Sequence, residues 1–139
     1  MSMQGRAASA VAMTDLGRAA ASGATRGGVI ALVGGLGAGK THWTKGMVAA
    51  LGCHAEVTSP TFSLVHEYRG GCLTVFHFDF YRLESAAEVI ALGWDEYLDA
   101  GGLTIVEWAD KFPEVLPQDA IWLRLSVEPD ASRLVTRLA

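Results

Sequence analysis

The sequence has no run of apolar residues as long as the ~20 that a membrane-spanning helix needs. Its two cysteines, Cys53 and Cys72, stand apart, without the close spacing of a zinc site or of a disulfide framework, which favours a reducing compartment. The Ala-rich start is interrupted by Arg6, Asp15 and Arg18, so it lacks the unbroken apolar core of a secretory signal. We expect a cytoplasmic protein without a membrane partner; because the start is poor in acids, a transit peptide is the alternative.

Basic residues are also scarce. The formal net charge is −4, and Lys40 is accompanied by only two other lysines. Nucleic-acid-binding proteins owe most of their sequence-independent affinity to lysines and arginines that neutralise phosphates. This composition therefore argues against direct binding of RNA or DNA. Half of the 139 residues are apolar, enough for one domain with a core. We expect a single domain over residues 1–139, with about the first eight residues as a flexible tail.

Strand-like and helix-like segments alternate along the chain, and apolar periodicity and turn residues set their limits. The expected elements are a helix ending near Gly23, a strand at Val29–Val33, a helix from about Gly39 to Leu51, a hairpin of residues 62–68 and 73–80, a short helix from Ser85, and strands at 103–106 and Ile121–Val127. This alternation indicates an α/β fold with a mostly parallel sheet, an antiparallel hairpin and flanking helices.

A phosphate-binding motif follows the strand expected at Val29–Val33. Residues 34–41 read GGLGAGKT and fit G-x-x-x-x-G-K-[ST], between a predicted strand and a predicted helix, as in P-loop NTPases. Glycines let backbone amides approach phosphate oxygens, and the helix start adds unpaired amides. Lys40 would bind the β- and γ-phosphates, and Thr41 would ligate Mg2+. The predicted nucleotide contacts in this segment are Gly34, Leu36, Gly37, Ala38, Gly39, Lys40, Thr41 and His42.

Magnesium also needs carboxylate ligands, and two acids stand at the ends of apolar runs. Glu107 closes LTIVE, at the carboxyl end of a predicted buried strand, where ligands gather in open α/β sheets. Asp79 ends the second run of the hairpin. Each could instead be a solvated strand end or pair with a cation such as Arg82. We take Lys40, Asp79 and Glu107 as candidate catalytic residues, and both acids as candidate metal ligands with Thr41.

Five blocks of sequence resemble the TsaE (YjeE) family: GGLGAGKT, TSPTFSLVHEY, HFDFYRL, LGWDEYL and IVEWADKF, in this order and at these spacings. The resemblance extends from about Ala10 to about Leu125, and the agreement of separate blocks makes it specific. It implies a P-loop ATPase of bacterial tRNA threonylcarbamoyladenosine synthesis, which modifies the adenosine next to the anticodon. It also implies two partner proteins, TsaB and TsaD, and ATP hydrolysis that resets their complex between turnovers.

The resemblance gives expected roles to particular residues. Lys40 and Thr41 would bind the phosphates and Mg2+. Glu107 looks like the acidic metal ligand, and Asp79 like a second acid that helps the metal or the attacking water. Thr61, in a Ser-Pro-Thr turn, resembles a switch residue that senses the γ-phosphate; a turn with a solvated hydroxyl is the alternative.

Other expected contacts are weaker. Trp108 matches an aromatic residue of the family, although an isolated tryptophan is more often part of the core. Ala10 and Arg133 are candidates for flanking the adenine. The chain departs from the family's usual pattern at Gly35, where an acid is usual, and at His42, where a second threonine is usual. His42 could contact the α-phosphate or simply be packed or solvated.

The remaining histidines, His54, His66 and His77, show no metal-ligand spacing, and we expect them to be packed or solvated. With so few lysines, the chain is expected to reach tRNA only through its protein partners. The sequence offers no evident arginine finger, so we expect slow ATP hydrolysis by the isolated chain and activation by partners.

Two other functions share the loop. A small-molecule kinase would add an acceptor site and an arginine-rich lid, whereas the sequence after the loop helix offers mainly Arg69 and Arg82. A nucleotide sensor would bind ATP without hydrolysing it. No N-K-x-D stretch is present to select guanine. We therefore expect ATP and Mg2+ as cofactors of an ATPase, with the kinase as the main alternative.

Overall fold

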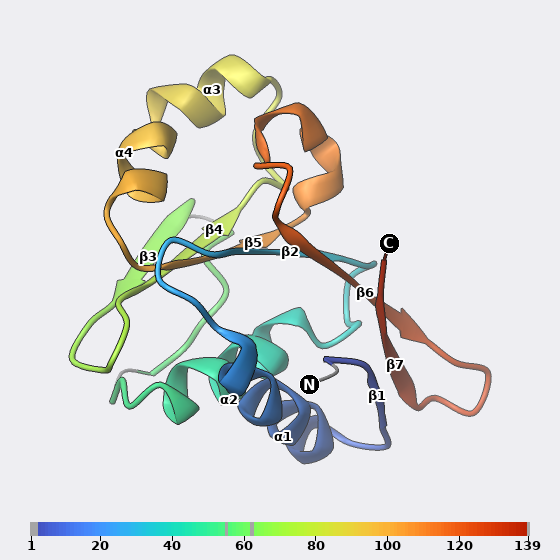
Figure 1. Cartoon of the computed structure of the whole chain (residues 1–139). Helices are drawn as coiled ribbons and strands as arrows, with labels where there is room; N and C mark the ends of the chain where they lie inside the picture. Colours follow the sequence, from blue (N-terminus) through green and yellow to red (C-terminus); the bar gives the residue numbers. More distant parts are fainter. Residues whose placement is uncertain (1–2, 55, 62, 139) are drawn as a thin grey trace.

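The computed structural model describes residues 3–54, 56–61 and 63–138, and this part of the chain is built around a seven-stranded sheet (Figure 1). The strand order is β1-β7-β6-β2-β5-β4-β3. The strands are β1 (Gly5–Ala7), β2 (Val29–Val33), β3 (Val65–Tyr68), β4 (Val75–Asp79), β5 (Leu103–Glu107), β6 (Ile121–Val127) and β7 (Arg133–Arg137). The helices are α1 (Ala10–Ala20), α2 (Lys40–Ala50), α3 (Ala86–Ala91) and α4 (Trp94–Asp99), with 3-10 turns η1 (Ala21–Gly23), η2 (Ala109–Lys111) and η3 (Pro113–Val115).

The centre of the sheet is parallel. Strands β4, β5, β2 and β6 run in one direction, whereas β3 pairs antiparallel with β4 at one edge and β7 pairs antiparallel with β6 and β1 at the other. The expected α/β fold, with a mostly parallel sheet and an antiparallel hairpin, is confirmed, and β3 and β4 form that hairpin. Because β2, β4 and β5 end at the same edge, the side chains that close or follow them meet there.

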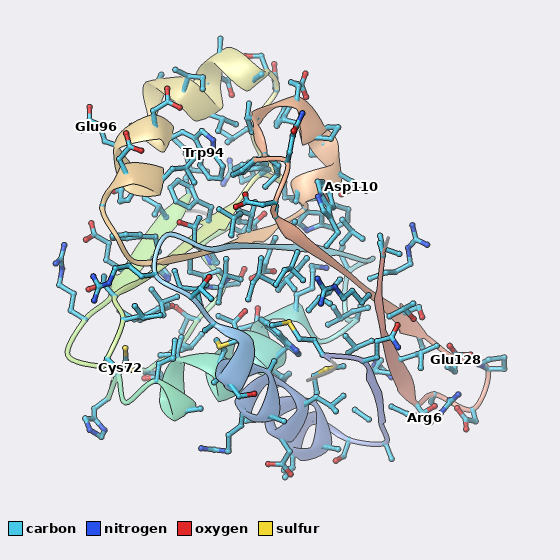
Figure 2. The ribbon with its side chains drawn as sticks, in the orientation of Figure 1. Arg6, Cys72, Trp94, Glu96, Asp110 and Glu128 are labelled. Atoms are coloured by element: carbon cyan, nitrogen blue, oxygen red, sulfur yellow. The ribbon has the colours of Figure 1, made fainter. Side chains whose placement is uncertain are left out.

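Helices cover both faces of the sheet (Figure 1). On one face α1 and α2 pack over the aliphatic side chains of β2 and β5, among them Ile30 and Ile105. On the other face α3, α4 and the turns η2 and η3 cover a second apolar cluster that includes Phe78. Trp94 points from α4 toward the sheet (Figure 2), with its ring 5.0 Å from that of Phe78 and its Nε1 donating to the Val115 carbonyl at 3.0 Å.

The amino-terminal segment differs from the expected tail. Gly5–Ala7 form strand β1, which pairs with β7, so that Arg6 is the register partner of Leu134. Residues 1–2 of the predicted tail lie outside the described residues. A strand of three residues leaves no periodic pattern in the sequence, and its partner lies at the far end of the chain. Local sequence patterns therefore could not reveal it.

Two further elements, α4 and β7, have no counterpart among the predictions. The first strand of the hairpin is also shorter than expected, because it begins at Val65; Phe62, within its predicted range, lies outside the described residues. None of the helices in the described ranges combines the length and the apolar character that a membrane crossing requires.

Candidate nucleotide-binding site

The turn between β2 and α2 adopts a left-handed backbone at three glycines. The φ angle is 151° at Gly34, 77° at Gly37 and 103° at Gly39, a region that residues with a side chain rarely occupy. At Gly34 a Cβ atom would also lie 2.3 Å from the Leu125 carbonyl oxygen of β6. Glycine is therefore required at these positions by the course of the backbone.

Residues 36–39 of this turn help to line a cavity of about 530 Å³. Within the described residues 35–39, the only amide that donates to a main-chain carbonyl is that of Ala38, to Gly35 at 3.3 Å. The amides of residues 40–42 begin α2, so helix geometry gives them no partner inside the helix. The turn therefore offers unpaired amides at the positive end of a helix dipole, a suitable place for an anion.

Lys40 is folded back onto this turn. Its Nζ donates to the carbonyl oxygens of Gly34 at 2.7 Å and Gly35 at 2.8 Å, and it lies 4.8 Å from the centre of the Trp108 ring. The side chain is buried. Burial lowers the pKa of Lys40 from its usual value, and the carboxylate of Glu107 opposes that shift.

The two candidate acids are buried beside each other. Asp79 is 1% exposed and Glu107 3%, so neither is a solvated strand end. Asp79 accepts hydrogen bonds from the Thr61 hydroxyl at 2.6 Å and from the Tyr81 amide at 2.8 Å. The Thr41 hydroxyl is 3.5 Å from Oε2 of Glu107, a long contact. Both carboxylates and the Thr41 hydroxyl thus border the same cavity as the turn.

A third titratable side chain belongs to this cluster. His77 is completely buried on β4, and its Nε2 is 2.6 Å from Oε2 of Glu107. The sequence gives no sign of this contact, because His77 and Glu107 lie on different strands, 30 positions apart. What the sequence could have shown is that His77 stands two positions before Asp79 on one strand, and therefore on the same face.

The predicted contacts come together around the cavity, with one exception. The lining includes Ala10, Leu36, Gly37, Ala38, Gly39, Lys40, Thr41, His42, Thr61, Asp79, Glu107, Trp108 and Arg133. Gly34 instead lines a second hollow of about 570 Å³ behind the turn, and it takes part in the site through its carbonyl on Lys40. Arg133 donates from Nε to the Gly37 carbonyl at 3.1 Å, so β7 is bonded directly to the turn.

The wall formed by the amino-terminal segment was not predicted in full. Ala7, Ser9 and Met13 line the cavity beside Ala10, and Ala131 lines it beside Arg133. Ser9 accepts a hydrogen bond from the Ala12 amide and caps α1, so the cap fixes the direction in which this helix leaves the cavity. The pairing of β1 with β7 brings these residues to the site. No local pattern in the sequence predicts that pairing, because its two strands lie near opposite ends of the chain.

The residues around the cavity fit Mg2+ better than a metal bound by the protein alone. In the described ranges, no group of three or more His, Cys, Asp or Glu side chains could hold an ion. Magnesium is commonly held by one or two carboxylates together with phosphate oxygens and waters. Glu107, Asp79 and the Thr41 hydroxyl offer such a partial set of hard oxygen ligands in the cavity that the turn also lines.

Comparison with known proteins identifies the family of this chain. Residues 7–135 match the family model described as threonylcarbamoyl adenosine biosynthesis protein TsaE. TsaE of Bacillus subtilis is 43% identical over 110 residues, which cover 79% of this chain and 68% of that protein; TsaE of Treponema pallidum is 38% identical over 110 residues, covering 79% and 81%. The crystal structure of Bacillus subtilis YdiB matches with a TM-score of 0.82 and 33% identity, over 96% of this chain and 82% of that one. The chain therefore belongs to the TsaE family of tRNA threonylcarbamoyladenosine biosynthesis proteins, and its fold is that of a P-loop nucleotide-binding protein.

Proposed function

We propose that this chain binds ATP with Mg2+ in the cavity over the β2–α2 turn and hydrolyses it during tRNA threonylcarbamoyladenosine synthesis in the cytoplasm. The observation that best supports this proposal is the state of Lys40. Its buried ammonium group is held by two carbonyl oxygens of the turn, next to unpaired amides. Neutral carbonyls compensate a buried cation less well than an anion does, so a phosphate that enters the cavity would compete for this lysine.

Binding would then follow from groups that already face the cavity. Lys40 would leave the carbonyl oxygens of Gly34 and Gly35 for the β- and γ-phosphate oxygens, and the amides of the turn would donate to the same phosphates. The Thr41 hydroxyl and Glu107 would hold the ion. When bound, Mg2+ neutralises charge on the phosphoryl oxygens as it develops during transfer to water.

Asp79 would act on the nucleophile. Its Oδ1 is held by the Tyr81 amide and its Oδ2 by the Thr61 hydroxyl, so the carboxylate has a fixed orientation at the cavity wall. A carboxylate in that position can accept a hydrogen bond from the attacking water. Since Thr61 belongs to the segment that also contains Ser59, a change in this segment on binding the γ-phosphate would reach Asp79 directly.

The partners TsaB and TsaD are part of the proposal. Among the described residues of the cavity wall, Arg133 is the one arginine, and its guanidinium donates to the carbonyls of Gly37 and Ala131. Arg133 would stabilise charge on a transferring phosphoryl group only after leaving these carbonyls. We therefore propose that the isolated chain hydrolyses ATP slowly, that partner proteins complete the site, and that tRNA is reached through them.

Two measurements test the proposal. Calorimetric titration of ADP with Mg2+ should show binding to the wild type, none to Lys40→Ala, and unchanged binding to Lys45→Ala, which removes an exposed lysine of the same helix. Release of inorganic phosphate from ATP should be slow for the chain alone and faster with TsaB, TsaD and tRNA.

Each alternative gives a different result. A phosphorylated metabolite formed by the chain alone would establish the small-molecule kinase. Nucleotide binding without phosphate release, under single-turnover conditions with all partners present, would establish a sensor. Equal binding by the wild type and Lys40→Ala would remove the loop from the nucleotide site altogether.

A further inference from the structure

The buried histidine of β4 has one polar contact that ties it to the candidate metal site. His77 is 0% exposed, and its Nε2 is 2.6 Å from Oε2 of Glu107. A carboxylate can only accept a hydrogen bond, so Nε2 is the donor. Among the described residues, the other ring nitrogen, Nδ1, has no hydrogen-bond partner.

A buried histidine with an unpaired ring nitrogen does not contribute to the stability of the fold as well as an apolar side chain would. A buried polar atom without a partner is unfavourable, and an apolar side chain of similar size would avoid it. The surroundings of His77 are otherwise suited to such a residue, since Val75 on the same face of β4 is completely buried in the apolar cluster under α2. The chemistry that a histidine adds here is the hydrogen bond to Glu107.

The bond acts on a side chain that needs orienting. Glu107 has three rotatable bonds and lies at the end of β5, while its register partner on β4 is Asp79. Oε2 receives both the His77 ring and the long contact from Thr41. The carboxylate is therefore held by one oxygen, and Oε1 remains available for an ion or its water.

We propose that His77 is a positioning residue for Glu107: it holds Oε2 and thereby presents the carboxylate to the magnesium ion of a bound nucleotide. This inference rests on the proposed function, because it requires that Glu107 act on the metal. Groups behind a metal ligand typically change metal affinity by about 10- to 100-fold when they are removed.

The test compares two amides that differ in reach. In His77→Gln the side-chain amide can stand near the position of Nε2 and donate to Glu107, whereas in His77→Asn it reaches only the position of Nδ1. Both variants bury one side-chain amide. A difference in ADP affinity between them therefore measures the hydrogen bond to Glu107 and not the burial of a polar group. The matched control is His66→Asn, because His66 is the register partner of His77 on β3 and bonds to Tyr68 instead.

The measurement is the affinity for ADP by calorimetry, once with Mg2+ and once with EDTA. We expect His77→Asn to lower the affinity in Mg2+ by about 10- to 100-fold and to leave the affinity in EDTA unchanged. His77→Gln should recover most of the loss, and His66→Asn should behave as the wild type. In a Glu107→Gln background, which has no carboxylate to position, His77→Asn should cause no further loss of Mg2+-supported binding.

The outcomes separate this inference from the proposed function. Equal affinities of His77→Gln and His77→Asn, or equal losses in Mg2+ and EDTA, overturn the positioning role. If Glu107→Gln has the Mg2+ dependence of the wild type, the metal role of Glu107 fails, and the inference fails with it. If Glu107→Gln loses that dependence while His77→Asn keeps it, only the inference is wrong.

Discussion

Asp79 and Glu107 are direct register partners on the parallel strands β4 and β5, so two buried carboxylates lie side by side at the edge of the sheet where the β2–α2 turn begins. Lys40 lines the same cavity and interacts electrostatically with both acids, but its Nζ is bonded to the carbonyls of Gly34 and Gly35. Two adjacent carboxylates repel each other and any phosphate that approaches without a counterion. A divalent cation relieves both repulsions at once.

This pair predicts opposite effects of one substitution in two buffers. Glu107→Gln keeps an acceptor for His77 and removes one charge. We expect it to weaken ADP binding in Mg2+, because a metal ligand is lost. In EDTA it should strengthen ADP binding by roughly tenfold, as expected for removing a unit charge several ångströms from a phosphate at an intermediate dielectric. Calorimetric titrations in the two buffers measure both effects.

The exposed Glu67 of the outer strand β3 provides the control, because it pairs with Arg69 and does not line the cavity. Glu67→Gln should change neither affinity. If Glu107→Gln weakens ADP binding equally in both buffers, the charge of Glu107 does not repel the phosphates of metal-free ADP. Glu107 would then have to support ADP binding by holding the cavity in shape.

A second prediction concerns the bond between Thr61 and Asp79. Thr61→Val keeps the shape of the side chain but leaves Oδ2 of the buried Asp79 without its 2.6 Å donor. Hydrogen bonds to charged groups contribute about 1.5–3 kcal/mol, so we expect a loss of free energy of unfolding in that range. Urea denaturation measures it. Thr61→Ser retains the hydroxyl and should restore most of the stability; if it is as unstable as Thr61→Val, the methyl group and not the bond is responsible.

Much of the fold follows from local patterns. The strand at Val29–Val33, the helix that follows the glycine turn and the strand at Ile121–Val127 are found where the sequence predicts them, because each has an uninterrupted apolar pattern and clear turn residues. The strands β1 and β7 lack such a pattern. Strand β1 is held by its pairing with β7 across the length of the chain, and β7 also pairs with β6, the strand that directly precedes it.

The candidate site divides in the same way. The motif of residues 34–41 could be recognised from its spacing alone, since a phosphate-binding turn needs glycines in the loop and a cationic side chain for the phosphates. Asp79 and Glu107 could be placed because they end strands. The contact between His77 and Glu107, and the wall around Ser9, depend on which strands are neighbours in the sheet. Strand order is a property of the whole fold that no short stretch of sequence contains.

A third prediction uses the pH dependence of Lys40. Burial lowers its pKa from 10.5, with Glu107 and Asp79 opposing the shift. Between the lowered pKa and 10.5 the unfolded chain therefore binds more protons than the folded chain, so folding stability contributed by this group rises with pH in that window. One group can contribute at most about 1.4 kcal/mol per pH unit.

The difference in free energy of unfolding between the wild type and Lys40→Met should thus move in favour of the wild type as the pH is raised toward 10.5. Urea denaturation of both proteins over a series of alkaline buffers measures this difference. Lys45→Met removes an exposed lysine of α2 and is the control. A difference that falls with pH would mean that the folded protein stabilises the charged form of Lys40 instead.

The last prediction concerns the close crossing of α1 and α2, which sets the position of Ala10 and Met13 at the cavity. A Cβ atom at Gly17 would lie 1.8 Å from the Trp43 carbonyl oxygen, and one at Gly46 would lie 1.8 Å from the Thr14 carbonyl oxygen. Both obstacles are backbone atoms of the facing helix, so they cannot turn aside as a side chain would. An alanine at either position has to push the two helices apart.

We therefore expect Gly46→Ala to reduce the free energy of unfolding by about 1–3 kcal/mol or more, although alanine favours a helix over glycine. Gly35→Ala is the matched control, because a Cβ there meets nothing within 4 Å, and it should not destabilise the fold. Denaturation of the variants in urea gives both values. Since displacement of α1 moves one wall of the cavity, Gly46→Ala should also weaken ADP binding equally in Mg2+ and in EDTA, unlike substitutions at Glu107. A stable Gly46→Ala protein with unchanged ADP affinity would show that the helices can separate without cost, and that α1 does not shape the nucleotide site.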